Sequence, residues 1–140
     1  MEEIMIKVIL GKKGTGKTKA LIELVNKALE ASDGAVVCIE KGDKLKYDIP
    51  YQCRLIDTVE YHIEDGQSLF GFIAGILASN HDVTDIFVDS ALKICKNDTE
   101  SFDLFLNELE ALIADHKVNC VITSSIEPTT ASKTALKFIG

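Results

Sequence analysis

The residues most able to do chemistry in this sequence lie between Gly11 and Thr18, where the chain reads G-K-K-G-T-G-K-T. Glycines let a backbone curl so that successive N–H groups point inward and form a nest for an anion. In such a loop the lysine, here Lys17, supplies positive charge to the outer phosphates, and the hydroxyl of Thr18 is placed to ligate Mg²⁺. The spacing therefore predicts a phosphate-binding loop formed by Gly11, Gly14, Thr15, Gly16, Lys17 and Thr18.

The segments on both sides of this loop are the ones that such a loop requires. Residues 4–10 are apolar except for Lys7, which predicts a strand buried on both faces. From Ala20 to Leu29 apolar residues recur at helical spacing, with charged residues on the opposite side. A helix that begins here presents free N–H groups and the positive end of its dipole to the same anion. The alternative, a chance glycine-rich turn, has to reproduce the loop and both flanks by accident.

The rest of the chain alternates predicted strands with predicted helices. Turn residues end the first helix at 32–34; strands are then predicted at 35–39, 53–57, 85–89 and 118–123, and helices at 67–80 and 98–116. Strands that alternate with helices predict a mostly parallel sheet covered on both faces. We therefore expect one domain over residues 1–140, an α/β three-layer sandwich with a mostly parallel five-stranded sheet.

Some local features are also predicted. Gln67 or Ser68 is expected to cap the second helix, in which Gly71 and Gly75 indicate close packing of the helix on the sheet. After Pro128, the tail fits either a short helix capped by Thr129 or Thr130, or a sixth strand at 136–139.

Polar side chains stand at the carboxyl ends of the predicted strands, where ligands bind in parallel sheets. After the glycine loop, these residues are Glu40, Asp57, Asp89 and Ser124. Asp89 follows three apolar residues, and an acid at this place is suited to hold Mg²⁺ opposite Thr18. The alternative is that Asp89 only caps the next turn.

Residues 11–18 match the Walker A motif and residues 86–89 match the Walker B pattern. On these motifs the chain resembles a P-loop NTPase of the RecA/AAA-like, additional-strand branch, in a minimal single-domain form. Residues 118–124 resemble the sensor strand of that branch, so the resemblance implies that Ser124 or Ser125 contacts the γ-phosphate. It also implies a P-loop NTPase fold with the RecA-like strand order 3-2-4-5-1.

The chain departs from this family in its catalytic residues. Many relatives carry a glutamate directly after the Walker B acid, where this chain has Ser90. RecA-like members use a glutamate at the end of the second strand, and Glu40 matches that place, so Glu40 is the candidate base and Lys17 the candidate catalytic cation. Alternatively, Glu40 only begins an exposed loop and Ser90 marks a slow or non-hydrolysing binder. Arg54, the only arginine, is either a surface residue or a finger offered to a neighbouring protomer.

The resemblance implies a Mg²⁺-dependent ATP-binding protein with weak ATPase activity. One alternative is a non-hydrolysing switch in which ATP orders residues 41–50 for a protein partner. Another is a RecA-like transferase, similar to thymidine kinases or corrinoid adenosyltransferases. Guanine specificity is disfavoured because residues 95–98 match the N-K-x-D motif only loosely and residues 89–92 lack a D-x-x-G switch.

Composition limits the partners and the compartment. The net charge of −7 disfavours general nucleic-acid binding, which needs clustered cations. The four cysteines form no C-x-x-C pair, and their spacing does not support the alternative of a zinc site. Cys38 and Cys120 fall inside predicted strands and are expected to be small core residues in a reducing cytosol. The N-terminus shows no cleavable apolar segment, and the apolar run at 69–78 is about half the ~20 residues that a bilayer span needs. A cytoplasmic protein without a membrane segment is expected, either alone or as a homo-oligomer.

Overall fold

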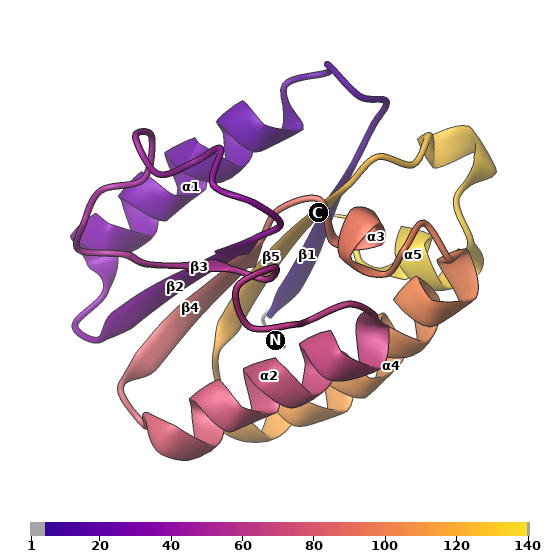
Figure 1. Cartoon of the computed structure of the whole chain (residues 1–140). Coiled ribbons are helices and arrows are strands. Elements are labelled where there is room, and N and C mark those ends of the chain that lie inside the picture. Colours follow the sequence, from indigo (N-terminus) through magenta and orange to yellow (C-terminus); the bar gives the residue numbers. More distant parts are fainter. Residues whose placement is uncertain (1–4, 140) are drawn as a thin grey trace.

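The fold is an α/β sandwich, seen in a computed structural model that describes residues 5–139 (Figure 1). Its elements are, in chain order, β1 (Ile6–Leu10), α1 (Lys17–Ala31), β2 (Ala35–Glu40), β3 (Arg54–Asp57), α2 (Gly66–Ser79), β4 (Val83–Val88), α3 (Ala91–Ile94), α4 (Thr99–His116), β5 (Asn119–Ser124), a 3₁₀ turn η1 (Pro128–Thr130) and α5 (Lys133–Lys137).

The five strands form one parallel sheet, which confirms the predicted class and strand count. Counted from the β1 edge, the order is β1-β5-β4-β2-β3; counted from the β3 edge, the same sheet reads 3-2-4-5-1. Ser124 at the end of β5 lies beside Leu10 of β1, directly before the glycine loop. Val88 of β4 lies between Ile39 of β2 and Ile122 of β5. The carboxyl ends of all five strands therefore meet at one edge of the sheet.

The two faces of the sheet bury alternate residues of each strand, as the pleat requires. In β2, Val36 and Cys38 share a core with Leu21 and Val25 of α1. Their neighbours on the strand belong to the opposite core, which is formed with α2, α3 and α4. Figure 1 shows the same division, with α1 on one side of the sheet and α2 and α4 on the other. Helix α1 thus brings its N-terminus to the sheet edge from one side.

The segment between β2 and β3 is held against the α1 side of the sheet by apolar side chains. Leu45 and Ile49 are 3% and 7% exposed and pack in the same core as α1. Because a single helix covers this face, the anchors fill area that α1 leaves open. The loop is therefore part of the core while its lysines remain in solvent.

Helix α2 differs from its prediction at both its cap and its glycines. Asp65 is the N-cap, and Ser68 completes a capping box from the third helical position, so the expected caps Gln67 and Ser68 were wrong. A capping acceptor lies two or three residues before its N–H partner, and Asp65 lies three residues before Ser68. Close packing at Gly71 and Gly75 was also wrong, because both are exposed and a Cβ on either would meet nothing within 4 Å.

The chain after β4 also departs from the prediction. A four-residue helix, α3, follows directly on a left-handed Ser90 (φ 56°), and no periodicity reveals so short a helix. In the tail, Ser132 caps α5, and residues 128–130 form a 3₁₀ turn rather than supplying the cap. The alternative sixth strand reduces to an isolated bridge between Val8 and Ile139. Within residues 5–139, no helix is both long and apolar enough to span a bilayer.

Candidate functional site

The glycine loop adopts the backbone that its glycines allow. Gly14 and Gly16 have φ of 86° and 84°, a region that side chains disfavour. The loop is closed on itself at one carbonyl: Lys12 O accepts the Thr15 hydroxyl at 2.7 Å and the Lys17 ammonium at 2.7 Å. A Cβ on Gly11 would lie 2.6 Å from the Thr15 hydroxyl oxygen, so this position has no room for a side chain. The loop is preshaped, and Lys17 is folded over it.

The N-terminus of α1 is open toward the loop. Gly16 is its N-cap in a left-handed conformation, no side chain caps the helix, and its first turn carries no acidic residue. The N–H groups of the first turn are therefore left for a ligand, and the helix dipole adds positive potential there. Burial lowers the pKa of Lys17 from its ordinary value, and the charge of Asp89 partly opposes this shift. An anion at this point would meet N–H donors and one ammonium group.

Asp89 contacts polar side chains of helix α1 and strand β5. It follows β4 and is 8% exposed. Its Oδ1 accepts the Thr123 hydroxyl at 2.7 Å, and both carboxylate oxygens lie near Thr18 Oγ1, at 3.2 and 3.3 Å. Thr123 Oγ1 in turn accepts the N–H of Ser90 at 2.8 Å. The structure thus brings together the two residues proposed for the metal, Thr18 and Asp89.

Thr123 was missed by the sequence analysis, which singled out the next two residues. It lies at the end of β5 and beside the end of β4, where strand register places its hydroxyl against Asp89. The sequence signal that would have found Thr123 is a hydroxyl residue near the end of a strand that lies beside the strand ending in Asp89. Ser124 Oγ is buried and has no hydrogen-bond partner among residues 5–139. Ser125 is exposed and lines the cleft described below.

Glu40 ends β2 and is 2% exposed, so it does not begin an exposed loop. Its Oε2 accepts the N–H of Leu45 at 3.0 Å. Burial is the main cause that raises the pKa of Glu40 above its ordinary value, and the charge of Asp89 adds to it, while the Leu45 hydrogen bond lowers it. Asp57, at the end of β3, holds the same loop through the N–H of Gly42 at 2.8 Å. Two carboxylates therefore fix the backbone on either side of Lys44.

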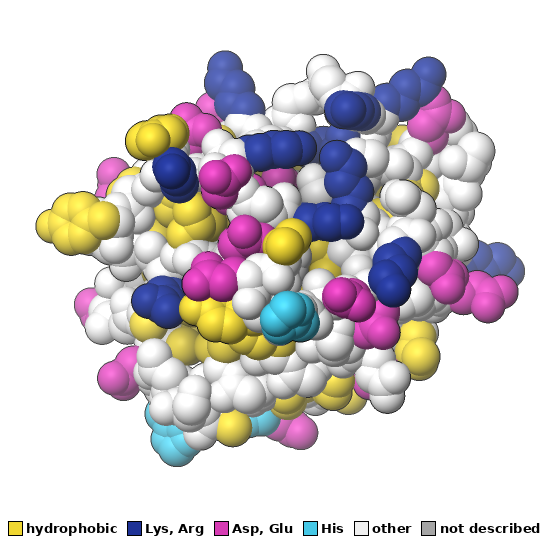
Figure 2. Space-filling model, viewed as in Figure 1, with side chains coloured by type: hydrophobic (Ala, Val, Ile, Leu, Met, Phe, Trp, Pro, Cys, Tyr) yellow, Lys and Arg dark blue, Asp and Glu magenta, His cyan; other side chains and the backbone are white. Residues whose placement is uncertain are grey.

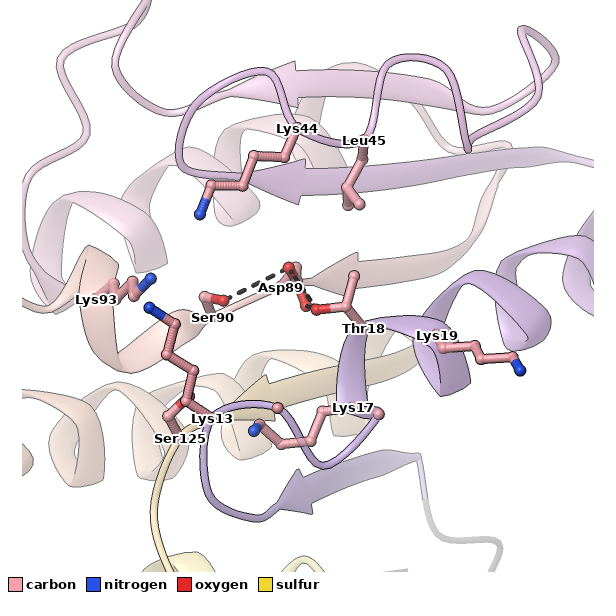
Figure 3. Close-up of a pocket in the computed structure, with 12 residues that line it drawn as sticks. Lys13, Lys17, Thr18, Lys19, Lys44, Leu45, Asp89, Ser90, Lys93 and Ser125 are labelled. Atoms are coloured by element: carbon pink, nitrogen blue, oxygen red, sulfur yellow. Dashed lines mark hydrogen bonds between the residues drawn. The ribbon is translucent and has the colours of Figure 1, made fainter.

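A cleft of about 220 Å³ opens between the glycine loop, the end of β4 and the loop after β2 (Figure 3). Five lysines line it: Lys13, Lys17, Lys19, Lys44 and Lys93. Asp89 is the one carboxylate among its lining residues, so the lining carries a formal charge of +4 on a chain whose net charge is −7. Figure 2 shows lysine and arginine side chains gathered around the middle and top of this face. The cleft is built to attract an anion.

Other candidates from the sequence lie elsewhere. Arg54 is exposed on β3, the edge strand. The four cysteines are free and buried, which confirms the prediction that Cys38 and Cys120 are core residues. The part of the chain that the structure describes contains no group of three or more His, Cys, Asp or Glu residues arranged to hold a metal ion.

Comparisons with known proteins add a likeness of fold. No family model matches the sequence, and no curated protein matches it. Among solved structures, the chain is similar to the pCW3 conjugation coupling protein TcpA, in its monomer form with ATPγS, at a TM-score of 0.50 and 12% identity. At this identity the likeness is one of fold. The match covers 98% of this chain and 47% of that one, so the chain spans about half the length of its neighbour.

Proposed function

We propose that this chain is a P-loop NTPase that binds ATP with Mg²⁺ in the lysine-lined cleft and hydrolyses it slowly. One observation carries the proposal: Thr18 meets Asp89 at 3.2 Å directly beside the open N-terminus of α1. A phosphate-binding loop and a hydroxyl–carboxylate pair at the same helix end form the two halves of a metal–triphosphate site. The likeness to TcpA with ATPγS supports a nucleoside triphosphate as the ligand.

In this proposal the loop holds the phosphates. The N–H groups of residues 14–18 bind the phosphate oxygens. This binding requires no rearrangement of the loop backbone, because Gly14 and Gly16 already have positive φ. Lys17 leaves the carbonyl of Lys12 and turns to the outer phosphates. Of the two candidates for the γ-phosphate contact, Ser125 lines the cleft and is the proposed contact, whereas Ser124 is buried and does not line it.

The donors present fit a magnesium ion. Mg²⁺ prefers hard oxygen ligands and takes one or two protein oxygens together with phosphates and water. Neighbouring ligands of an octahedral ion at 2.0–2.1 Å lie about 2.9 Å apart. The observed separation of 3.2–3.3 Å between Thr18 Oγ1 and the Asp89 oxygens is close to that value. When bound, the ion neutralises charge on the β- and γ-phosphates. Thr123 orients Asp89 by donating to Oδ1.

Slow hydrolysis follows from the carboxylates. Asp89 is committed to the metal, and Ser90 follows it in place of a second acid. Glu40 is the proposed base, since burial raises its pKa and makes it a better proton acceptor. However, Glu40 already accepts the Leu45 N–H, and Leu45, not Glu40, lines the cleft. Leu45 has to shift before Glu40 reaches a water, which lowers the rate.

Titration calorimetry with ATP, with and without Mg²⁺, tests the proposal, together with phosphate release at high enzyme concentration. Lys17→Ala should weaken ATP binding about 10- to 150-fold, the equivalent of one charged hydrogen bond of about 1.5–3 kcal/mol. The melting temperature should not change, because the Lys17 ammonium contacts only an exposed loop carbonyl. Lys27→Ala, on the exposed side of the same helix and outside the cleft lining, is the matched control. Unchanged affinity in Lys17→Ala would contradict the phosphate role.

A second candidate, a non-hydrolysing nucleotide switch, is favoured by the coupling of the cleft to an exposed aromatic segment. Leu45 lines the cleft, and the same segment carries Tyr47 and Tyr51, which are 89% and 92% exposed. A ligand that displaces Leu45 therefore moves two tyrosines that a protein partner can contact. Tight ATP binding with no phosphate release in either wild type or Glu40→Gln would establish this function in place of the slow ATPase.

A further inference from the structure

Three of the lysines in the cleft come from three different elements and lie together. Lys13 belongs to the glycine loop, Lys44 to the loop after β2, and Lys93 to α3 after β4. In Figure 3 their amines lie on one side of Asp89, with Thr18 on the other side. The amine of Lys17 points elsewhere, back over the glycine loop. These three lysines are therefore not needed to build the phosphate loop itself.

The charge in the cleft exceeds what one nucleotide neutralises. Mg·ATP carries a formal charge of about −2, because four phosphate charges meet one divalent ion. The lining carries +4, from five lysines against one aspartate, so a charge of +2 remains. None of the five lysines forms an ion pair with a carboxylate in residues 5–139; the two ion pairs found there use Lys12 and Lys137.

The backbone that presents two of these lysines is held in place. Lys44 stands between Gly42 and Leu45, whose N–H groups are bound by Asp57 and Glu40. Lys93 follows the left-handed turn at Ser90, whose N–H is bound by Thr123. Lys93 is also half-buried. The backbone that carries Lys44 and Lys93 is therefore anchored beside the cleft that both residues line.

We infer that Lys13, Lys44 and Lys93 form a second anion subsite, which takes the phosphate group of a second ligand while Mg·ATP occupies the phosphate loop. A phosphate monoester is a compact dianion and matches the remaining charge of +2. Lysine binds phosphate as a point charge, and three ammonium groups from different directions can contact three oxygens at once. The inference rests on the proposed function, because the subsite is defined by the space that the triphosphate leaves.

The test is a titration of the protein saturated with Mg²⁺ and a non-hydrolysable ATP analogue. The probes are inorganic phosphate and glycerol phosphate, with succinate as a dicarboxylate of the same charge. Both phosphates should bind with one-to-one stoichiometry, and succinate should bind at least tenfold more weakly. Lys44→Gln and Lys93→Gln should each weaken phosphate binding about tenfold or more, the loss of one charged hydrogen bond. Lys27→Gln is the matched control, because Lys27 is exposed on α1 and does not line the cleft.

Each outcome decides between the two proposals. Analogue binding without phosphate binding overturns the subsite and leaves the proposed function standing. If Lys44→Gln and Lys93→Gln weaken analogue binding as much as phosphate binding, the lysines serve the triphosphate and the subsite is overturned. If succinate binds as well as phosphate, the subsite does not select phosphate and the assignment of its ligand is overturned. If the analogue does not bind at all, both the proposed function and the subsite fall.

Discussion

Glu40 has two separable roles, and a pair of substitutions separates them. In Glu40→Ala the N–H of Leu45 loses its acceptor, and Leu45 is 3% exposed. A buried donor left unsatisfied costs about 1–3 kcal/mol, so the free energy of unfolding should fall by about that amount. In Glu40→Gln an amide oxygen takes the place of the carboxylate oxygen and keeps the hydrogen bond. Its stability at pH 7 should lie within about 1 kcal/mol of wild type, or above it.

The pH dependence of that comparison has a defined sign. Burial raises the pKa of Glu40 above its ordinary 4.5, so the folded state holds this proton more tightly than the unfolded state. The contribution of Glu40 to stability is therefore fully present below about pH 4.5 and is lost as the pH rises through the folded pKa. Glutamine does not titrate. The difference in unfolding free energy between Glu40→Gln and wild type should thus shift in favour of the variant as the pH rises above 4.5.

Urea unfolding from pH 4 to 8 measures these differences, and ATP turnover at pH 7.5 measures the chemistry. Glu40→Gln should bind ATP like wild type and release no phosphate, since it keeps the loop and lacks the base. Wild-type turnover in Glu40→Gln would refute the role of Glu40 as a base. Wild-type stability in Glu40→Ala would refute the buried anchor. A difference in unfolding free energy between wild type and Glu40→Gln that does not change with pH would refute it as well.

Two further predictions concern the fold. In Gly34→Ala the new Cβ would lie 1.9 Å from the carbonyl oxygen of Asp82, so the free energy of unfolding in urea should fall by about 1–3 kcal/mol or more. In the control Gly71→Ala, at an exposed position within α2 where a Cβ meets nothing within 4 Å, the free energy of unfolding should rise by about 0.5–1 kcal/mol. Equal effects of the two substitutions would contradict the packing described at Gly34. Burial raises the pKa of Cys53 and Cys95 to about 11, which leaves about one thiol in a thousand ionised at pH 8. A disulfide reagent should therefore label these thiols slowly in the native protein and at once in the urea-unfolded protein. Rapid labelling of the native protein would show that these thiols are not buried.

The local sequence was enough to predict those parts of the structure that depend on a single stretch of the chain. The glycine loop, the strand before it and the helix after it were all predicted, because φ preferences and periodicity are properties of neighbouring residues. The burial of Cys38 and Cys120 was predicted for the same reason. Errors arose where a distant contact decides: α2 packs through Leu69, Ile73 and Leu77, so its glycines face outward.

The sequence by itself determined that residues 11–18 form a glycine loop between a strand and a helix and that acids and hydroxyls end the strands. Only the tertiary structure decided which of these groups meet: Thr123 rather than Ser124 donates to Asp89, Glu40 binds the backbone of its own loop, and lysines from three segments line one cleft. The physical reason is that parallel strands collect their carboxyl ends at one edge, while the register between strands and the turns after them set each side chain's neighbours. Among the contacts between distant residues, the meeting of Thr18 and Asp89, 71 positions apart, was expected from the Walker A and Walker B motifs, and no local pattern encodes the others.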